Sequence, residues 1–69
     1  MDHNLVVPGD IYVSKPWETS GIDARVYTIL SMSKAGAQVM CTRATGTTIM
    51  DLSVHWFYRA NWLHQYYLI

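Results

Sequence analysis

The stretch from Arg25 to Arg43 constrains this chain most, because two runs typical of β-strands flank a short break at Gly36. Residues 25–32 and 37–43 both alternate in side-chain character, as strands do when one face packs against a core. A glycine at the break supplies the positive φ that a tight hairpin needs. The sequence therefore predicts a β-hairpin whose second strand places Ala37, Val39 and Cys41 on one face.

The first strand of this hairpin carries some apolar residues on each of its two faces, which predicts a central position in the sheet. Strict alternation places Tyr27, Ile29 and Ser31 on one face. It places Leu30 and Met32 on the other, together with the remaining even-numbered residues of the strand.

Three further segments complete the predicted sheet: residues 11–13, 47–50 and 62–69. Turns containing Gly9 and Gly46 precede the first two. Residues 54–58 lack alternation and follow Ser53, a residue type whose hydroxyl caps helices, so one helical turn is expected there. The last segment is apolar on both faces, and its simplest partner is the first strand. We therefore expect an all-β fold, a five-stranded and strongly bent barrel that forms a single domain over residues 1–69, with residues 1–6 loose.

A domain of 69 residues is only marginally stable from its hydrophobic core alone. The sequence shows neither a disulfide pair nor a metal-site pattern that would stabilise it further. Cys41 is the single cysteine and has no intrachain disulfide partner. His3, His55 and His64 do not show the spacing of a zinc site, so we expect no metal and no cofactor. Apolar residues make up 51% of the chain and must supply the stability.

The charges balance, with five basic and five acidic residues. Neutrality argues against a general binder of polyanions, which needs a basic field. The alternative that remains open is a small nucleic-acid-binding barrel that uses Arg25, Lys34 and Arg43 beside aromatic residues. Neutrality also gives little repulsion between copies, which favours a homodimer formed through an exposed strand or an aromatic patch.

The sequence shows no pattern of a signal peptide and no apolar run long enough to cross a membrane. We therefore expect a cytoplasmic protein. Cys41, His55 and Asp51 are the residue types of a nucleophilic triad, but a cysteine on a strand face beside Val39 is typical of a buried structural thiol. We expect no enzymatic activity.

Residues 55–62 are the best candidate for a binding surface, since they combine Trp, Tyr and Arg, the residue types that dominate protein–protein interfaces. The alternative is that this stretch packs one end of the barrel. Both hold if Phe57 points inward and the others lie partly outward. Trp17, on a polar loop, is either a lid on the core or a further contact. The candidate partner-binding residues are Trp56, Tyr58, Arg59, Trp62 and Trp17.

The order of these elements resembles small SH3-like barrels. The residues that carry the resemblance are Pro8-Gly9-Asp10-Ile11-Tyr12, the run Val26-Tyr27-Thr28-Ile29-Leu30, the Gly36 and Gly46 turns with the strands after them, and Trp56-Phe57 before the last strand. The pattern is similar to short proteins carried by phages and prophages. This resemblance implies a fold and a mobile-element origin, and it assigns no catalytic residue. The expected function is a non-enzymatic module that binds a host protein or complex and inhibits or adapts it by occlusion.

Overall fold

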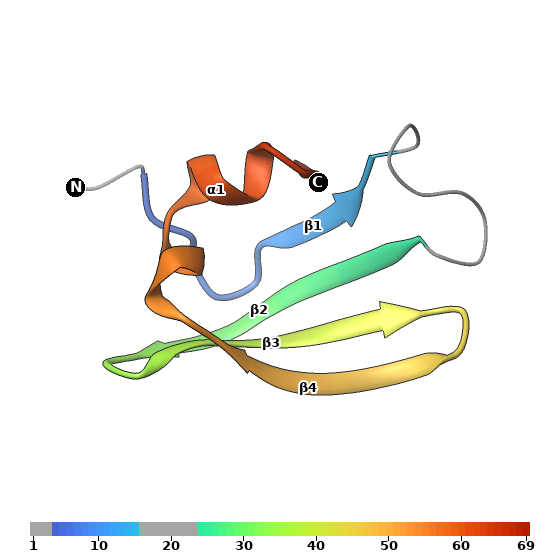
Figure 1. Ribbon diagram of the computed structural model, residues 1–69, viewed down its shortest axis with the longest axis horizontal. Helices are drawn as coiled ribbons and strands as arrows, with labels where there is room; N and C mark the ends of the chain where they lie inside the picture. Colours follow the sequence, from blue (N-terminus) through green and yellow to red (C-terminus); the bar gives the residue numbers. More distant parts are fainter. Residues whose placement is uncertain (1–3, 16–23) are drawn as a thin grey trace.

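The computed structural model describes residues 4–15 and 24–69, and they form a β-rich fold with two short helical segments. The long strands lie side by side and α1 lies above β1 (Figure 1). The elements are β1 (Ile11–Ser14), β2 (Arg25–Ser33), β3 (Gly36–Arg43), β4 (Gly46–Leu52), the 3-10 helix η2 (Val54–Phe57), α1 (Arg59–Leu63) and β5 (Tyr66–Leu68).

The strands form one five-stranded antiparallel sheet in the order β4-β3-β2-β1-β5. The predicted pairing of the last strand with the first is confirmed, with Val13 opposite Tyr67. The predicted hairpin is also confirmed, and Arg25 lies opposite Arg43 at its open end. The central position of β2 follows from the strand order.

A β-bulge in β2 overturns the strict alternation expected there. Ile29 lies opposite Val39, but Ser31 lies opposite Gln38, so Leu30 is an extra residue in the ladder. An extra residue shifts the side chains after it to the other face. Met32 therefore packs against the core together with Tyr27, and Ser31 joins the outer face of the sheet, contrary to the prediction.

Gly36 makes the tight turn between β2 and β3 possible. Its φ is 148°, a conformation that L-residues rarely adopt. A Cβ atom at this position would also overlap the backbone carbonyl oxygen of Leu52, at the end of β4. The turn is therefore packed directly against the strand that leads into η2.

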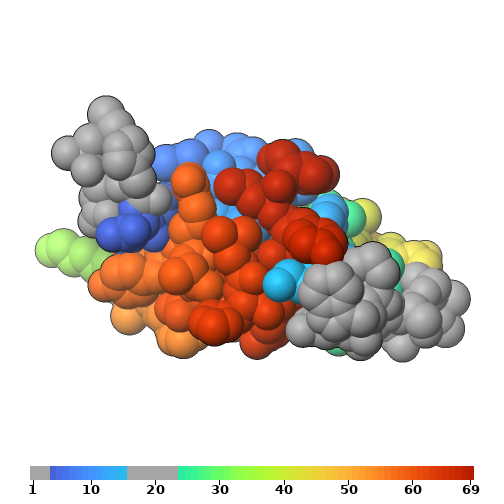
Figure 2. Space-filling view, turned by 90° about the horizontal axis from the view of Figure 1, so that it is seen from above, coloured from blue at the N-terminus to red at the C-terminus, as the bar shows by residue number. Residues whose placement is uncertain are grey.

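The core is centred on Trp62, whose indole lies between aromatic rings from the sheet and from η2. It stacks on Tyr12 with ring centroids 4.8 Å apart, and its centroid is also 4.8 Å from that of Trp56. The face seen from above shows residues of η2 and α1 across its middle, where they cover the sheet (Figure 2). The buried apolar residues around Trp62 are Val6, Tyr12, Ile29, Ala37, Val39 and Tyr66.

The prediction that residues 62–69 form one closing strand was wrong at its start. Trp62 belongs to α1, and the strand is limited to Tyr66–Leu68. The helical turn continues because His64 N–H donates to the Ala60 carbonyl at 3.2 Å and Gln65 N–H donates to the Trp62 carbonyl at 3.0 Å. From α1, the Trp62 ring packs against the core face of the sheet, where it stacks on Tyr12.

Two smaller expectations for the ends of elements also need correction. The helical turn after Ser53 is confirmed as η2, but the Ser53 side chain makes no capping hydrogen bond. Residues 1–6 are not loose throughout, because Leu5 forms a β-bridge with Tyr58. Val6 is buried, and its N–H donates to the Phe57 carbonyl at 2.8 Å. Backbone pairing with the η2–α1 junction thus fixes the segment before β1.

Candidate functional site

An apolar hollow opens beside Trp56, where η2 crosses the sheet. Its volume is about 80 Å³, and its lining consists almost entirely of aromatic rings. Trp62 forms part of the wall, and its Nε1–H donates to the Trp56 carbonyl at 2.8 Å. The lining residues are Tyr27, Leu52, Trp56, Trp62 and Tyr66.

Trp56 is held in place although it is only half-buried. The His55 ring meets it edge-on, with centroids 5.0 Å apart, and Trp62 lies behind it at 4.8 Å. Asn61 donates its side-chain amide to the His55 carbonyl at 2.7 Å, which ties α1 to η2. A ring fixed before binding loses little conformational freedom when a ligand contacts it.

Arg25 provides a polar neighbour for this aromatic cluster. Its guanidinium interacts with the hydroxyls of Tyr27 and Tyr66, and the interaction with Tyr27 raises the pKa of Arg25. Burial raises the pKa of Tyr27 to about 12, so its hydroxyl stays protonated at neutral pH. The Nε atom of Arg25 is buried without a hydrogen-bond partner. The tyrosine hydroxyls and the guanidinium therefore add hydrogen-bonding groups to an otherwise apolar site.

The size of the hollow limits what it accepts. Pockets for drug-sized ligands and cofactors usually measure about 300–1,000 Å³. A hollow of about 80 Å³ has room instead for a single small apolar side chain. Fixed aromatic walls with nearby hydrogen-bonding groups are typical of a socket for one residue of a protein partner.

The predicted contact residues fall into two groups. Trp56 and Trp62 come together at the hollow, but Trp62 is only 1% exposed and forms part of the core, so the expectation that it lies partly outward was wrong. Its ring points inward because α1 places it against Tyr12, on which it stacks. Tyr58 is 51% exposed and lies apart from the hollow, next to Leu5.

Arg59 has a structural contact that the sequence reasoning missed. Its guanidinium forms an ion pair with Asp10 at 3.3 Å, and the same carboxylate oxygen accepts hydrogen bonds from the Tyr12 hydroxyl at 3.2 Å and from Val7 N–H at 3.1 Å. This network joins α1 to the turn before β1. The one sequence signal for this contact was Asp10, an acidic residue that follows Pro8 and Gly9 in the predicted turn. Trp17, the last predicted contact residue, lies outside the described residues.

The basic residues proposed for nucleic acid do not form one cluster. Arg25 and Arg43 are directly opposite each other. Lys34 lies in the turn at the other end of the same hairpin, beyond the nine residues of β2. At about 3.3 Å per residue, that strand separates the two ends by nearly 30 Å.

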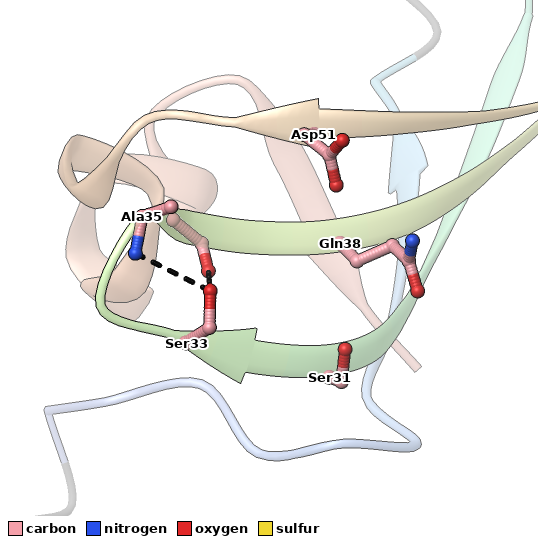
Figure 3. A pocket seen from close by; sticks show the side chains of 6 residues that line it. Ser31, Ser33, Ala35, Gln38 and Asp51 are labelled. Carbon is pink, nitrogen blue, oxygen red and sulfur yellow. Dashed lines mark hydrogen bonds between the residues drawn. The ribbon is translucent and has the colours of Figure 1, made fainter.

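A second, polar hollow lies on the outer face of the sheet, near the Gly36 turn, with a volume of about 220 Å³. Asp51, Gln38 and Ser31 are cross-strand neighbours on β4, β3 and β2, and their side chains gather there (Figure 3). This hollow could not be expected from strict alternation, which places Ser31 on the same face as Tyr27 and Ile29. The bulge at Leu30 moves Ser31 to the outer face.

Cys41 and Asp51, two of the three side chains of a candidate nucleophilic triad, are not brought together. Cys41 is 5% exposed and faces the core from β3. Its partner on β4 is Thr48, and Asp51, three residues further along β4, projects from the opposite face of the sheet. Among the described residues, no group of three or more His, Cys, Asp or Glu side chains is placed to hold a metal ion. Within the same ranges, no helix is long and apolar enough to cross a membrane.

Comparisons with protein-family models, with curated proteins and with solved structures found no match for this chain.

Proposed function

We propose that this chain is a non-enzymatic protein-binding module built on an SH3-like barrel, and that the aromatic hollow beside Trp56 is its binding socket. The observation that carries the proposal is the half-buried Trp56, fixed by its neighbours, over a hollow sized for one small apolar side chain. Aromatic anchors of this kind supply most of the binding energy at protein interfaces.

In the proposed mechanism, the partner inserts one small apolar side chain against Trp56 and Tyr27. Burying that side chain removes apolar surface from water on both molecules. Arg25 and the tyrosine hydroxyls then hydrogen-bond a backbone carbonyl of the partner, which fixes the direction of the bound segment. The module acts by occlusion, since its bound surface becomes inaccessible to other proteins. The phage-type pattern of the sequence supports a host protein or complex, such as a defence system, as the partner.

The test compares the wild-type chain with Trp56→Ala and with the matched control Tyr58→Ala, which removes an exposed ring outside the hollow. Proteins captured from a bacterial cytoplasmic extract are identified, and the affinity of the purified partner is measured for each variant. We expect Trp56→Ala to weaken binding by about 30-fold or more, as hot-spot truncations do. Tyr58→Ala should change the affinity by less than about threefold.

Circular dichroism of each variant checks that it is folded. Trp56→Phe, which keeps an aromatic ring, should retain part of the affinity and covers the case in which Trp56→Ala does not fold. The proposal is wrong if folded Trp56→Ala captures the same partner with unchanged affinity.

The opposed arginines favour one alternative function, nucleic-acid binding at the open end of the hairpin. Arg25 and Arg43 concentrate two positive charges on neighbouring strands. Phosphate contacts are strongest at low ionic strength. A chain that is not retained on heparin or DNA at low salt excludes this alternative, and loss of retention in Arg43→Ala supports it.

A further inference from the structure

The edge of the sheet formed by β4 lacks the features that normally protect an edge strand. In the described part of the chain, β4 pairs with β3 alone, and six of its seven residues are exposed. It contains no proline, lysine or bulge, and Asp51 is its one charged residue. An edge strand without such protective features can pair with a strand of another chain.

The outer face next to this edge carries an uncharged row of side chains that crosses four strands. Ile49 on β4 lies opposite Met40 on β3, Met40 opposite Thr28 on β2, and Thr28 opposite Ile11 on β1. Ile49, at the open end of the row, is 59% exposed. The row therefore ends abruptly at the unpaired edge, with its largest apolar surface outermost.

We propose that the occupant of this edge is a second copy of the chain, added antiparallel to β4 about a two-fold axis that places Ile49 opposite the Ile49 of the other copy. The two uncharged rows then join into one across both sheets. The edge backbone groups gain hydrogen-bond partners, and the exposed Ile49 side chains cover each other. This proposal is independent of the aromatic hollow.

The charges and side chains of β4 favour this register over an axis at Asp51 and over a slip by one residue. Counting outward from Ile49, Thr47 faces Asp51 of the other copy, so a hydroxyl donor meets a carboxylate. The two Asp51 carboxylates lie about 13 Å apart along the strands, at about 3.3 Å per residue. A two-fold axis at Asp51 would instead oppose the carboxylates directly, which is destabilising. A slip by one residue would set outer-face residues against core-face residues.

Whole-molecule charge does not oppose this association. The chain carries five basic and five acidic residues, so two copies have little net repulsion. The contact is a short one, made by the seven residues of β4 and the row beside them. We therefore expect a dimer that dissociates on dilution rather than a permanent one.

Sedimentation velocity over a range of concentrations tests the dimer and its location. We expect the wild-type chain to shift from monomer to dimer as its concentration rises. Ile49→Lys opposes two ammonium groups on the two-fold axis and should weaken the dimer at least tenfold. Val7→Lys introduces the same charge at a 50% exposed position before β1, away from the β4 edge, and should leave the dimer unchanged.

Charge changes at Thr47 test the register. Thr47→Lys places an ammonium opposite Asp51 of the other copy and should tighten the dimer severalfold. Thr47→Asp places like charges opposite each other and should weaken it by a similar factor. In a register not centred on Ile49 these two variants would not diverge in this way.

Cross-linking gives a direct readout of the symmetry axis. With oxidised glutathione as oxidant, Ile49→Cys should form a disulfide-linked dimer, because a residue on the axis faces itself. Thr47→Cys should not, because its two copies lie about 13 Å apart, beyond disulfide reach. The wild-type chain, with Cys41 buried, is the blank.

A strict monomer at high concentration would overturn the proposal. So would a dimer unaffected by Ile49→Lys, or equal cross-linking of the two cysteine variants. Trp56→Ala should leave the dimer unchanged, so failure of this proposal and failure of the proposed binding function are distinguishable.

Discussion

The half of the sheet beneath η2 and α1 differs from the half that ends at the edge strand β4. Under the helices, Trp62 and Tyr12 are completely enclosed, and even the turn at Gly36 is packed against its neighbours. On β4, by contrast, Leu52 is half-buried and the other six residues are exposed. A chain this small has enough apolar residues to cover only one region of its sheet, and the rest of the sheet stays exposed to solvent. The covered half therefore holds the core of the fold, and β4 contributes mainly exposed surface.

The sharpest test of this comparison replaces one large side chain in each half. Trp62→Ala removes the centre of the core and should cost about 3–5 kcal/mol, as large aromatic truncations do. That loss approaches the total stability of a small domain, so we expect a largely unfolded chain. Ile49→Ala, at an exposed position, should change stability by about 0.5 kcal/mol or less at protein concentrations where the chain is monomeric.

Urea unfolding followed by circular dichroism measures both variants. A folded Trp62→Ala with near wild-type stability would mean that the covered half does not carry the fold.

The two turn glycines provide a second, smaller contrast between the halves. Both have a positive φ, 148° at Gly36 and 141° at Gly46, so alanine is strained by about 1–3 kcal/mol at either position. Gly46 has open space around it, whereas a Cβ at Gly36 would overlap the carbonyl of Leu52. We expect Gly36→Ala to be clearly more destabilising than Gly46→Ala when the urea midpoints are compared. Equal losses of stability in the two variants would show that the structure around Gly36 can make room for the added methyl group without further destabilisation.

The smallest expected effect is a pH dependence that arises in the covered half. Burial raises the pKa of Tyr27 to about 12, above its ordinary value of about 10. Between these values the unfolded chain releases a proton that the folded chain keeps, so stability is full below about pH 10 and decreases as pH rises toward about 12.

Urea midpoints measured at pH 8 and pH 11 detect this decrease. Tyr27→Phe, which keeps the ring and removes the proton, should reduce it. A smaller slope should remain from Tyr12, whose pKa burial also raises. A pH dependence identical in Tyr27→Phe and wild type would assign the titration to other groups.

The sheet was predictable from the sequence because alternation and turn glycines are local signals. The hairpin at Gly36, the inward face of Ala37, Val39 and Cys41, and the pairing of the last strand with the first all follow from them. The bulge at Leu30 was not predictable, because nothing in the composition of β2 marks which residue is extra. That single residue decided the face on which Ser31 and Met32 lie.

The candidate site was predictable only in part, because aromatic residues look alike in a sequence whether they pack or bind. The stretch from His55 to Trp62 does contain Trp56, the half-buried ring of the hollow. The burial of Trp62 depends on α1, and α1 interrupts a run of residues that is otherwise typical of a strand. The role of Arg59 depends on Asp10, a contact between distant parts of the chain that no spacing rule reveals.

The stacking of Trp62 on Tyr12 also suggests an order of events during folding. These rings come from nearly opposite ends of the described chain, so their contact requires closing a very long loop, whereas β2, β3 and β4 join through short turns. Long-range contacts form late when local pairing is available. We therefore expect the meander to nucleate first and the indole to dock after the rate-limiting step. Interactions formed after that step determine how fast a native protein unfolds. We therefore expect the lifetime of the folded chain to depend on how fast the Trp62 ring leaves the core.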